Sequence, residues 1–207
     1  MPCVLQTLRT AVRLLAQEPI LLRGSLLANL TAFATEHSAD EPKERSSAQG
    51  GASLTAQGIS PMSAEAAAVC AEAERVLTDL GLGPRVAALP KGLHTLVEES
   101  GLSEGERQLL SLARALVAGG RAKLRILLCD EPTSNVDFGS DAKVMDALLA
   151  LNGVSVVLSA HRLQHLRRFE RVCVMDKGTV EECGPPEELL ADEGSWLSAL
   201  ANAHAGE

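Results

Sequence analysis

The chain has 207 residues, of which 46% are hydrophobic and 22% are charged, the balance of a single globular domain. Its formal net charge of -8 argues against the basic surface on which nucleic-acid binding depends, so we expect no nucleic-acid partner. Aromatic residues make up only 2% of the chain, so the core must be aliphatic.

Membrane-spanning, secreted and zinc-binding proteins are also disfavoured. No run approaches the roughly 20 apolar residues that cross a bilayer, and residues 1–6 lack the charged start of a secretory signal. The five cysteines are odd in number and never spaced C-x-x-C, which predicts reduced thiols rather than disulfides. His161 and His165 lie four residues apart, but no acidic or thiol residue has the spacing of a further zinc ligand.

The first third of the chain changes character along its length. Residues 5–16 carry apolar side chains at helical spacing, which predicts a helix. A short apolar run at 20–22 is broken at Arg23, and a short helix or turn follows to Leu30. Residues 36–60 contain scarcely a large apolar side chain, which predicts a disordered surface insertion in one domain spanning 1–207.

The remainder alternates helical and strand patterns. Helices are predicted over 63–80, from 104 to about 118, over 144–151 and over 195–203, the last with Trp196, Leu197 and Leu200 facing inward. The runs 124–129 and 154–158 are apolar enough to be strands buried on both faces, and 171–175 and 179–182 form a hairpin. This alternation predicts an α/β fold with a parallel sheet.

Two carboxylates, Asp130 and Glu131, end the first of these strands. Ligands of open α/β sheets bind beyond the carboxyl ends of the strands. An Asp at that place can hold Mg²⁺, and a neighbouring carboxylate can polarise an attacking water. Taken alone, Ile126–Glu131 fits a solvated acidic turn equally well.

The segment Ser103-x-x-Glu106 precedes the apolar run of a predicted helix. It matches a capping box, in which the Ser103 hydroxyl and the Glu106 carboxylate satisfy each other's backbone N–H groups. The same helix N-terminus also suits a phosphate group. The segment alone is compatible with both interpretations.

The order and spacing of the segments together resemble the nucleotide-binding domain of ABC transporters, most closely the second such domain of the multidrug-resistance-associated (C) subfamily. The resemblance covers nearly the whole chain except 36–60. The matching segments are 17–21 (Q-loop), 24–30 (its continuation), 102–106 (signature), 126–131 (Walker B), 134–137 (D-loop) and 160–163 (H-loop).

The resemblance implies a P-loop NTPase-like ABC ATPase core, with a parallel sheet and a helical signature subdomain. It implies ATP and Mg²⁺ as cofactors, and ATP hydrolysis coupled to transport by an exporter. The implied partners are transmembrane domains and a second nucleotide-binding domain in head-to-tail arrangement, and the implied location is the cytoplasmic face of a membrane.

The resemblance also implies a role for each matching residue. Two residues bind the metal: Asp130 through water, and Gln17, which also contacts the lytic water and couples to the transmembrane helices. Glu131 is the general base, and His161 contacts the γ-phosphate. Ser103 and Gly105 meet the γ-phosphate of a nucleotide held by the partner domain, and Asp137 lies at the seam between the two domains.

The phosphate-binding Walker A motif G-x-x-x-x-G-K-[ST] does not occur in the 207 residues, because every Lys follows Pro, Ala or Asp. We therefore expect an N-terminally truncated domain without its first strands and P-loop, which does not hydrolyse ATP alone. Unpaired strand edges should then make the isolated chain marginally stable or prone to aggregate. Glu104 and Glu106 also stand where the family has neutral residues, which should weaken anion binding.

Three alternatives remain open. In the first, the chain is a non-catalytic module that lends its signature segment to the Walker A of a partner. The second is an inactive gene fragment, and the third is a DNA-repair or chromosome-maintenance ATPase of the same superfamily. The Q-loop continuation, the exporter-like H-loop and the acidic charge disfavour the last of these.

Overall fold

The computed structural model describes residues 11–32, 64–117 and 124–204. The chain divides into two compact units between Leu158 and Ser159, and each is described by itself. The predicted insertion at 36–60 lies outside the described residues. Within the described part of the chain, no helix combines the length and the apolar character needed to cross a membrane.

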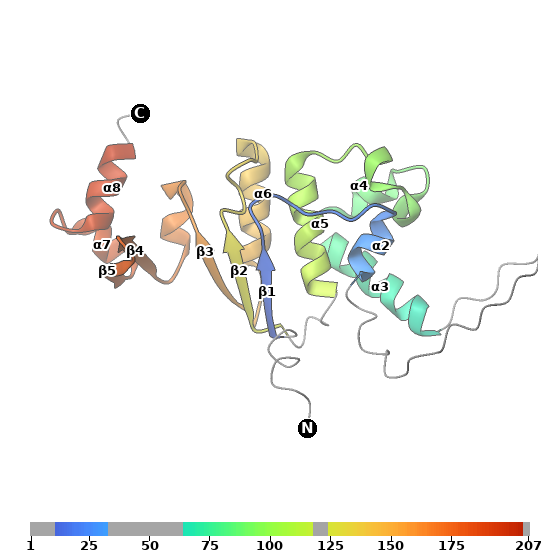
Figure 1. The fold of residues 1–207 in the computed structure, drawn as a ribbon, viewed down its shortest axis with the longest axis horizontal. Helices are drawn as coiled ribbons and strands as arrows, with labels where there is room; N and C mark the ends of the chain where they lie inside the picture. Colours follow the sequence, from blue (N-terminus) through green and yellow to red (C-terminus); the bar gives the residue numbers. More distant parts are fainter. Residues whose placement is uncertain (1–10, 33–63, 118–123, 205–207) are drawn as a thin grey trace, which may run out of the picture. The chain divides into compact units, whose positions relative to one another are not determined.

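The first unit is built on a three-stranded sheet in the order β1-β2-β3, formed by Val12–Leu15, Ile126–Asp130 and Ser155–Ser159 (Figure 1). β1 and β2 are parallel, with Leu15 opposite Cys129. The two later strands were predicted. The helix predicted over 5–16 is wrong at Val12–Leu15, which form β1. A short apolar run fits both the 3.6-residue repeat of a helix and the two-residue repeat of a strand, and here the pairing with β2 makes it a strand.

Helices pack against this sheet and against one another (Figure 1). They are α2 (Leu26–Thr31), α3 (Ala64–Asp79), α4 (Gly83–Ala87), α5 (Glu104–Val117) and α6 (Phe138–Leu149), with 3-10 turns η2 (Gly92–His94) and η3 (Val97–Glu99). The three longer helices confirm the predictions over 63–80, from 104, and over 144–151. Because α5 contacts β1, α2, α3 and α6, it is buried on nearly every side.

The described residues cover only one face of the sheet, so the prediction that both faces of the strands are buried is wrong. Along β2, Leu127 and Cys129 are buried, whereas Ile126 and Leu128 are 37% and 39% exposed. Leu14, the register partner of Leu128, is 67% exposed. Parallel sheets are normally covered on both faces, so this apolar face suits a contact with further polypeptide.

Polar substitution on this face should improve the behaviour of the isolated chain. We expect Leu14→Lys combined with Val157→Lys to reduce aggregation and binding of the dye ANS, and to leave the melting temperature nearly unchanged, because both side chains are more than half exposed. Light scattering, ANS fluorescence and thermal denaturation measure the three effects. Leu15→Lys, which places the charge at a buried position, is the matched control and should unfold the chain.

Burial in β2 raises the pKa of the Cys129 thiol from 9.0 to about 12. The charged thiolate is therefore disfavoured in the folded chain. The buried neutral thiol makes its full contribution to stability below pH 9. Between pH 9 and about 12 the unfolded thiol ionises first. In this range we expect the free energy of unfolding to fall with pH, by up to about 1.4 kcal/mol per pH unit from this group. Cys129→Ala should show a shallower fall in urea titrations at pH 8, 9 and 10.

The second unit contains η4 (Leu163–Arg168), the β4–β5 hairpin (Val172–Asp176 and Thr179–Gly184), α7 (Pro186–Ala191) and α8 (Trp196–His204). The hairpin is confirmed, and its Lys177-Gly178 turn has positive φ at both residues, as in a type I′ turn. The terminal helix is confirmed too. Of its three residues predicted to face inward only Leu197 is buried, because Trp196 and Leu200 are 49% and 42% exposed.

The hairpin also corrects the prediction that all cysteines are reduced. Cys173 and Cys183 are directly opposite each other on β4 and β5, and their sulfur atoms are bonded as a disulfide. Counting cysteines could not find this pair, since the hairpin register alone brings the two residues together. Cys70 and Cys129 are free thiols.

Candidate functional site

The carboxyl ends of β1 and β2 bring three predicted site residues to one edge of the sheet. Because Leu15 is level with Cys129, the chain leaves β1 at Ala16 where Asp130 ends β2. Gln17 and Asp130 are exposed there, and Glu131 is half-buried. This edge is the usual ligand-binding edge of an open α/β sheet.

Glu131 has an unusual backbone. Its φ is +42°, in the left-handed region that residues other than Gly rarely adopt. The Ser134 backbone N–H and hydroxyl both donate to the Glu131 carbonyl oxygen, at 3.1 Å each, and close a tight turn. Strained conformations of this kind cluster at functional sites, so the backbone of Glu131 is consistent with a catalytic position.

The loop that carries Gln17 is held at both ends by buried amides that the sequence analysis did not single out. At the start of the loop, the Gln108 side chain of α5 donates to the Ala16 carbonyl at 2.9 Å. At its end, the Asn29 amide accepts from the Leu22 N–H at 2.7 Å and donates to the Leu22 carbonyl at 2.9 Å. Both amides are at most 1% exposed. No sequence signal distinguishes them from surface amides.

The capping box predicted at the start of α5 is confirmed. The Glu106 N–H donates to the Ser103 hydroxyl at 3.2 Å, and the Ser103 N–H donates to the Glu106 carboxylate at 2.8 Å. The guanidinium of Arg85 lies 3.5 Å from the same carboxylate and also donates to the Ser100 carbonyl. Of the two acidic residues in the signature segment, Glu106 is therefore hydrogen-bonded in the cap and paired with Arg85.

Gly105 is required by packing. A Cβ atom at this position would lie 2.4 Å from the Ser140 Cβ and 3.1 Å from a Val136 methyl group. The first turn of α5 therefore approaches the first turn of α6 too closely for any side chain. This contact joins the predicted signature and D-loop segments, and it explains the glycine without reference to phosphate.

Asp137 caps the N-terminus of α6. Its carboxylate accepts from the Gly139 N–H at 3.0 Å and the Ser140 N–H at 3.1 Å. Hydrogen bonds from the Ser140 hydroxyl and backbone hold the pKa of Asp137 below its usual range. The carboxylate and the neighbouring Phe138, which is 75% exposed, both lie at the surface, where a partner can reach them.

His161 belongs to the second unit and is exposed. The structure therefore brings together Gln17, Asp130 and Glu131 at the sheet edge, and Gly105 and Ser140 at the junction of α5 and α6. His161 is described separately from both groups.

The residues at the sheet edge have the chemistry that Mg²⁺ requires. The Asp130 carboxylate and the Gln17 amide offer oxygen atoms, which Mg²⁺ prefers. The described residues contain no cluster of three or more His, Cys, Asp or Glu side chains suited to a metal ion. A magnesium ion needs no such cluster, because it keeps several waters and binds one or two carboxylates together with substrate phosphates.

Comparison with known proteins gives relatives that match nearly the whole chain. The chain is 33% identical over 207 residues to the ABC-type transporter cicA of Emericella nidulans, and the match covers 95% of this chain and 13% of that protein. It is 32% identical over 205 residues to the ABC transporter ATP-binding protein/permease VMR1 of Saccharomyces cerevisiae, covering 98% of this chain and 12% of that protein. The chain's homologues are ABC transporters. It spans little more than a tenth of the length of these two, and no protein-family model matches it.

The fold is that of an ABC ATPase core. The chain superposes with a TM-score of 0.70 on a bacterial Atm1-family ABC exporter solved with ATP bound, at 23% identity, covering 98% of this chain and 30% of that one. A shorter match, 39% identical over 128 residues, is to the probable multidrug resistance ABC transporter ATP-binding/permease protein YheH of Bacillus subtilis, covering 60% of this chain and 18% of that protein.

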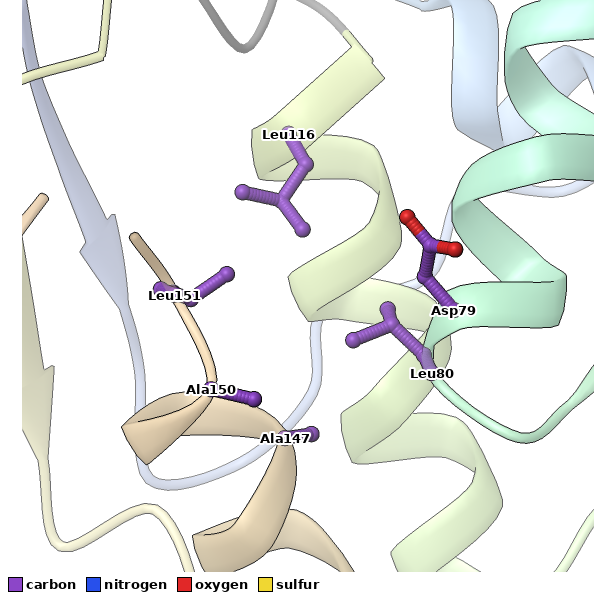
Figure 2. Close-up of a pocket in the computed structure, with 6 residues that line it drawn as sticks. All are labelled: Asp79, Leu80, Leu116, Ala147, Ala150 and Leu151. Carbon is purple, nitrogen blue, oxygen red and sulfur yellow. The ribbon is translucent and has the colours of Figure 1, made fainter. Parts of the chain in front are cut away.

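A pocket of about 220 Å³ lies elsewhere in this ABC-type core. Figure 2 shows it between the ends of α3, α5 and α6, lined by Asp79, Leu80, Leu116, Ala147, Ala150 and Leu151. None of these residues belongs to the predicted site. Leu151 lies just before β3, and the pocket is therefore at the opposite end of the strands from Asp130. We assign it no part in nucleotide chemistry.

Proposed function

We propose that this chain is part of the ATP-binding, ATP-hydrolysing domain of an ABC-type exporter. The observation that carries the proposal is the group formed by Gln17, Asp130 and Glu131 at the carboxyl edge of a sheet with the ABC ATPase fold. Both fungal relatives are named as ABC-type transporters, and VMR1 as an ATP-binding protein/permease. ATP and Mg²⁺ are the cofactors that this proposal requires.

Each residue of the group has a chemical task in the proposal. Asp130 holds Mg²⁺ through water, and Gln17 offers its amide oxygen to the same ion. Glu131 accepts a proton from the attacking water, and the tight turn at Ser134 fixes the direction of its backbone. Phosphoryl transfer depends mainly on such positioning and on charge stabilisation. His161, on the second unit, is proposed to contact the γ-phosphate.

The phosphates themselves need a cradle that these residues do not supply. The 207 residues contain no Gly-Lys pair, and so no Walker A loop. We propose that the cradle comes from polypeptide outside this sequence. The exposed apolar face of β1 and β2 supports a working state in which more polypeptide covers the sheet. Transmembrane domains and a second nucleotide-binding domain, arranged head to tail, are the proposed partners, at the cytoplasmic face of a membrane.

A second function is favoured by the geometry at the start of α5. Ser103 is exposed at this helix N-terminus, and its hydroxyl accepts from the Glu106 N–H and keeps its own proton to donate to an anion. In this alternative the chain binds no nucleotide of its own and lends Ser103 and Gly105 to a partner's Walker A. An anion is favoured at such a terminus by the helix dipole.

Titration with fluorescently labelled ATP in Mg²⁺ tests both functions. We expect no submicromolar binding by the chain alone, and additional binding when an ABC nucleotide-binding domain with its own Walker A is present. Submicromolar binding by the chain alone, weakened by Asp130→Asn, would exclude the lending-only alternative. ATP binding by the mixture that equals that of the partner domain alone would contradict both functions.

A further inference from the structure

The Cys173–Cys183 pair lies on an exposed face of the β4–β5 hairpin. The two residues are register partners with their Cα atoms 4.1 Å apart, and both are exposed. The next pair along the hairpin, Val174 and Glu182, lies on the opposite face. Val174 is buried, and the Glu182 carboxylate accepts from the N–H groups of Trp196 and Leu197 at the start of α8. Solvent therefore reaches the sulfur atoms, while the other face is held by packing.

A cation lies beside one of the two sulfurs. The guanidinium of Arg171 donates to the Cys183 carbonyl at 3.2 Å and lies 3.9 Å from the Cys183 sulfur. A neighbouring guanidinium favours the thiolate, which is the nucleophilic form of cysteine. Of the two acidic residues that precede Cys183, Glu182 caps α8, and Glu181 accepts from the Thr179 hydroxyl at 2.6 Å.

We propose that Cys173 and Cys183 form a reversible redox modification site for low-molecular-weight disulfides, with Cys183 as the reacting thiol. In the reduced chain, the Cys183 thiolate attacks one sulfur of oxidised glutathione. A mixed disulfide forms, and one glutathione leaves as its thiolate. Cys173 then loses its proton and attacks the Cys183 sulfur, which forms the intramolecular disulfide and releases the second glutathione. Two electrons pass from the two cysteines to glutathione.

The hairpin geometry makes the second step fast. Cys173 is held opposite Cys183 by the backbone ladder, so closure needs no rearrangement of the chain. The same geometry explains why reduction is reversible, because the hairpin and the Glu182 cap hold the strands together without the bond. Cys129, buried in β2, provides an internal reporter, since it becomes reactive only if the first unit unfolds.

The test uses the full chain, reduced and then incubated in glutathione buffers of defined ratio. Free thiols are trapped with N-ethylmaleimide and the tryptic peptides are identified by mass spectrometry. We expect a Cys173–Cys183 disulfide that dithiothreitol removes. In Cys173→Ser the glutathione adduct should accumulate at Cys183. In Cys183→Ser the adduct at Cys173 should form several-fold more slowly.

The role of Arg171 is tested by its charge. We expect Arg171→Gln to slow formation of the glutathione adduct at Cys183 by about two- to threefold. The effect is small because Arg171 raises the thiolate fraction of Cys183 but also lowers the nucleophilicity of that thiolate. Arg171→Lys should keep most of the native rate, and Arg168→Gln, which removes an exposed charge from η4, should leave it unchanged. Unmodified Cys129 certifies that the first unit is folded in each variant. Equal rates at Cys173 and Cys183, or stable adducts at both without an intramolecular bond, would overturn the proposal.

Discussion

Replacing Leu127 by Ala is expected to lower the free energy of unfolding by about 2 to 5 kcal/mol, the usual cost of removing a buried leucine side chain. Leu127 is fully buried on β2, the central strand, and points to the face that the helices cover. The substitution leaves a cavity beneath the strand that ends in Asp130. Urea denaturation followed by far-ultraviolet circular dichroism measures the loss. Fluorescence is unsuitable because Trp196 lies in the second unit.

Leu128→Ala is the matched control. It removes the same atoms from the next residue of the same strand, on the exposed face. We expect a clearly smaller loss, because Leu128 is already 39% exposed and its removal leaves no enclosed cavity. Equal losses at both positions would show that the two faces of the sheet are covered alike, which contradicts the open face described above.

Gly105→Ala is the second substitution with a large expected effect. In an ordinary helix, Ala is more stable than Gly by about 0.5 to 1 kcal/mol. At this position the new Cβ would meet the Ser140 Cβ at 2.4 Å, so α5 and α6 must separate. We expect a net loss of about 1 to 3 kcal/mol, as for other overpacked positions. Thermal and urea unfolding measure the change.

Removing the obstructing atom should rescue the variant. We expect Ser140→Gly to restore much of the stability of Gly105→Ala, so that the double-mutant cycle gives a favourable coupling. The single variant Ser140→Gly measures the combined cost of losing the hydrogen bond from the Ser140 hydroxyl to Asp137 and of placing a glycine in α6. Gly139→Ala is a second control, since its Cβ would be 3.4 Å from the nearest atom. Additive effects of Gly105→Ala and Ser140→Gly would rule out the steric explanation.

The sequence predicted the elements whose pattern is long or chemically explicit. The sequence of α5 has both an apolar stripe and a capping box. The Lys177-Gly178 pair favours the positive φ angles of a tight turn, which predicts the hairpin. The α/β class and the strand that ends in Asp130 follow from the alternation of such patterns. The resemblance to ABC transporters added the expected order of the segments, and the homologues confirm that family relationship.

Features that depend on tertiary contacts were not predictable in this way. β1 has only four residues, and its pairing with β2 overrides a helical spacing. The open face of the sheet and the Cys173–Cys183 bond depend on which elements come together in space. Gln108 and Asn29 position the Gln17 loop through side-chain hydrogen bonds to backbone groups, and these bonds leave no trace in residue spacing.

In the proposed function, this chain supplies ABC-type groups to a nucleotide whose phosphate cradle lies elsewhere. The most direct test is the rate of Mg²⁺-dependent ATP hydrolysis by an ABC nucleotide-binding domain that has its own Walker A, measured against the concentration of added chain. We expect a saturable rise in the rate of hydrolysis. Ser103→Arg should abolish this rise, and Ser103→Thr, which keeps a capping hydroxyl, should preserve it. An unchanged rate at every concentration, or an equal rise with Ser103→Arg, would contradict the proposed function.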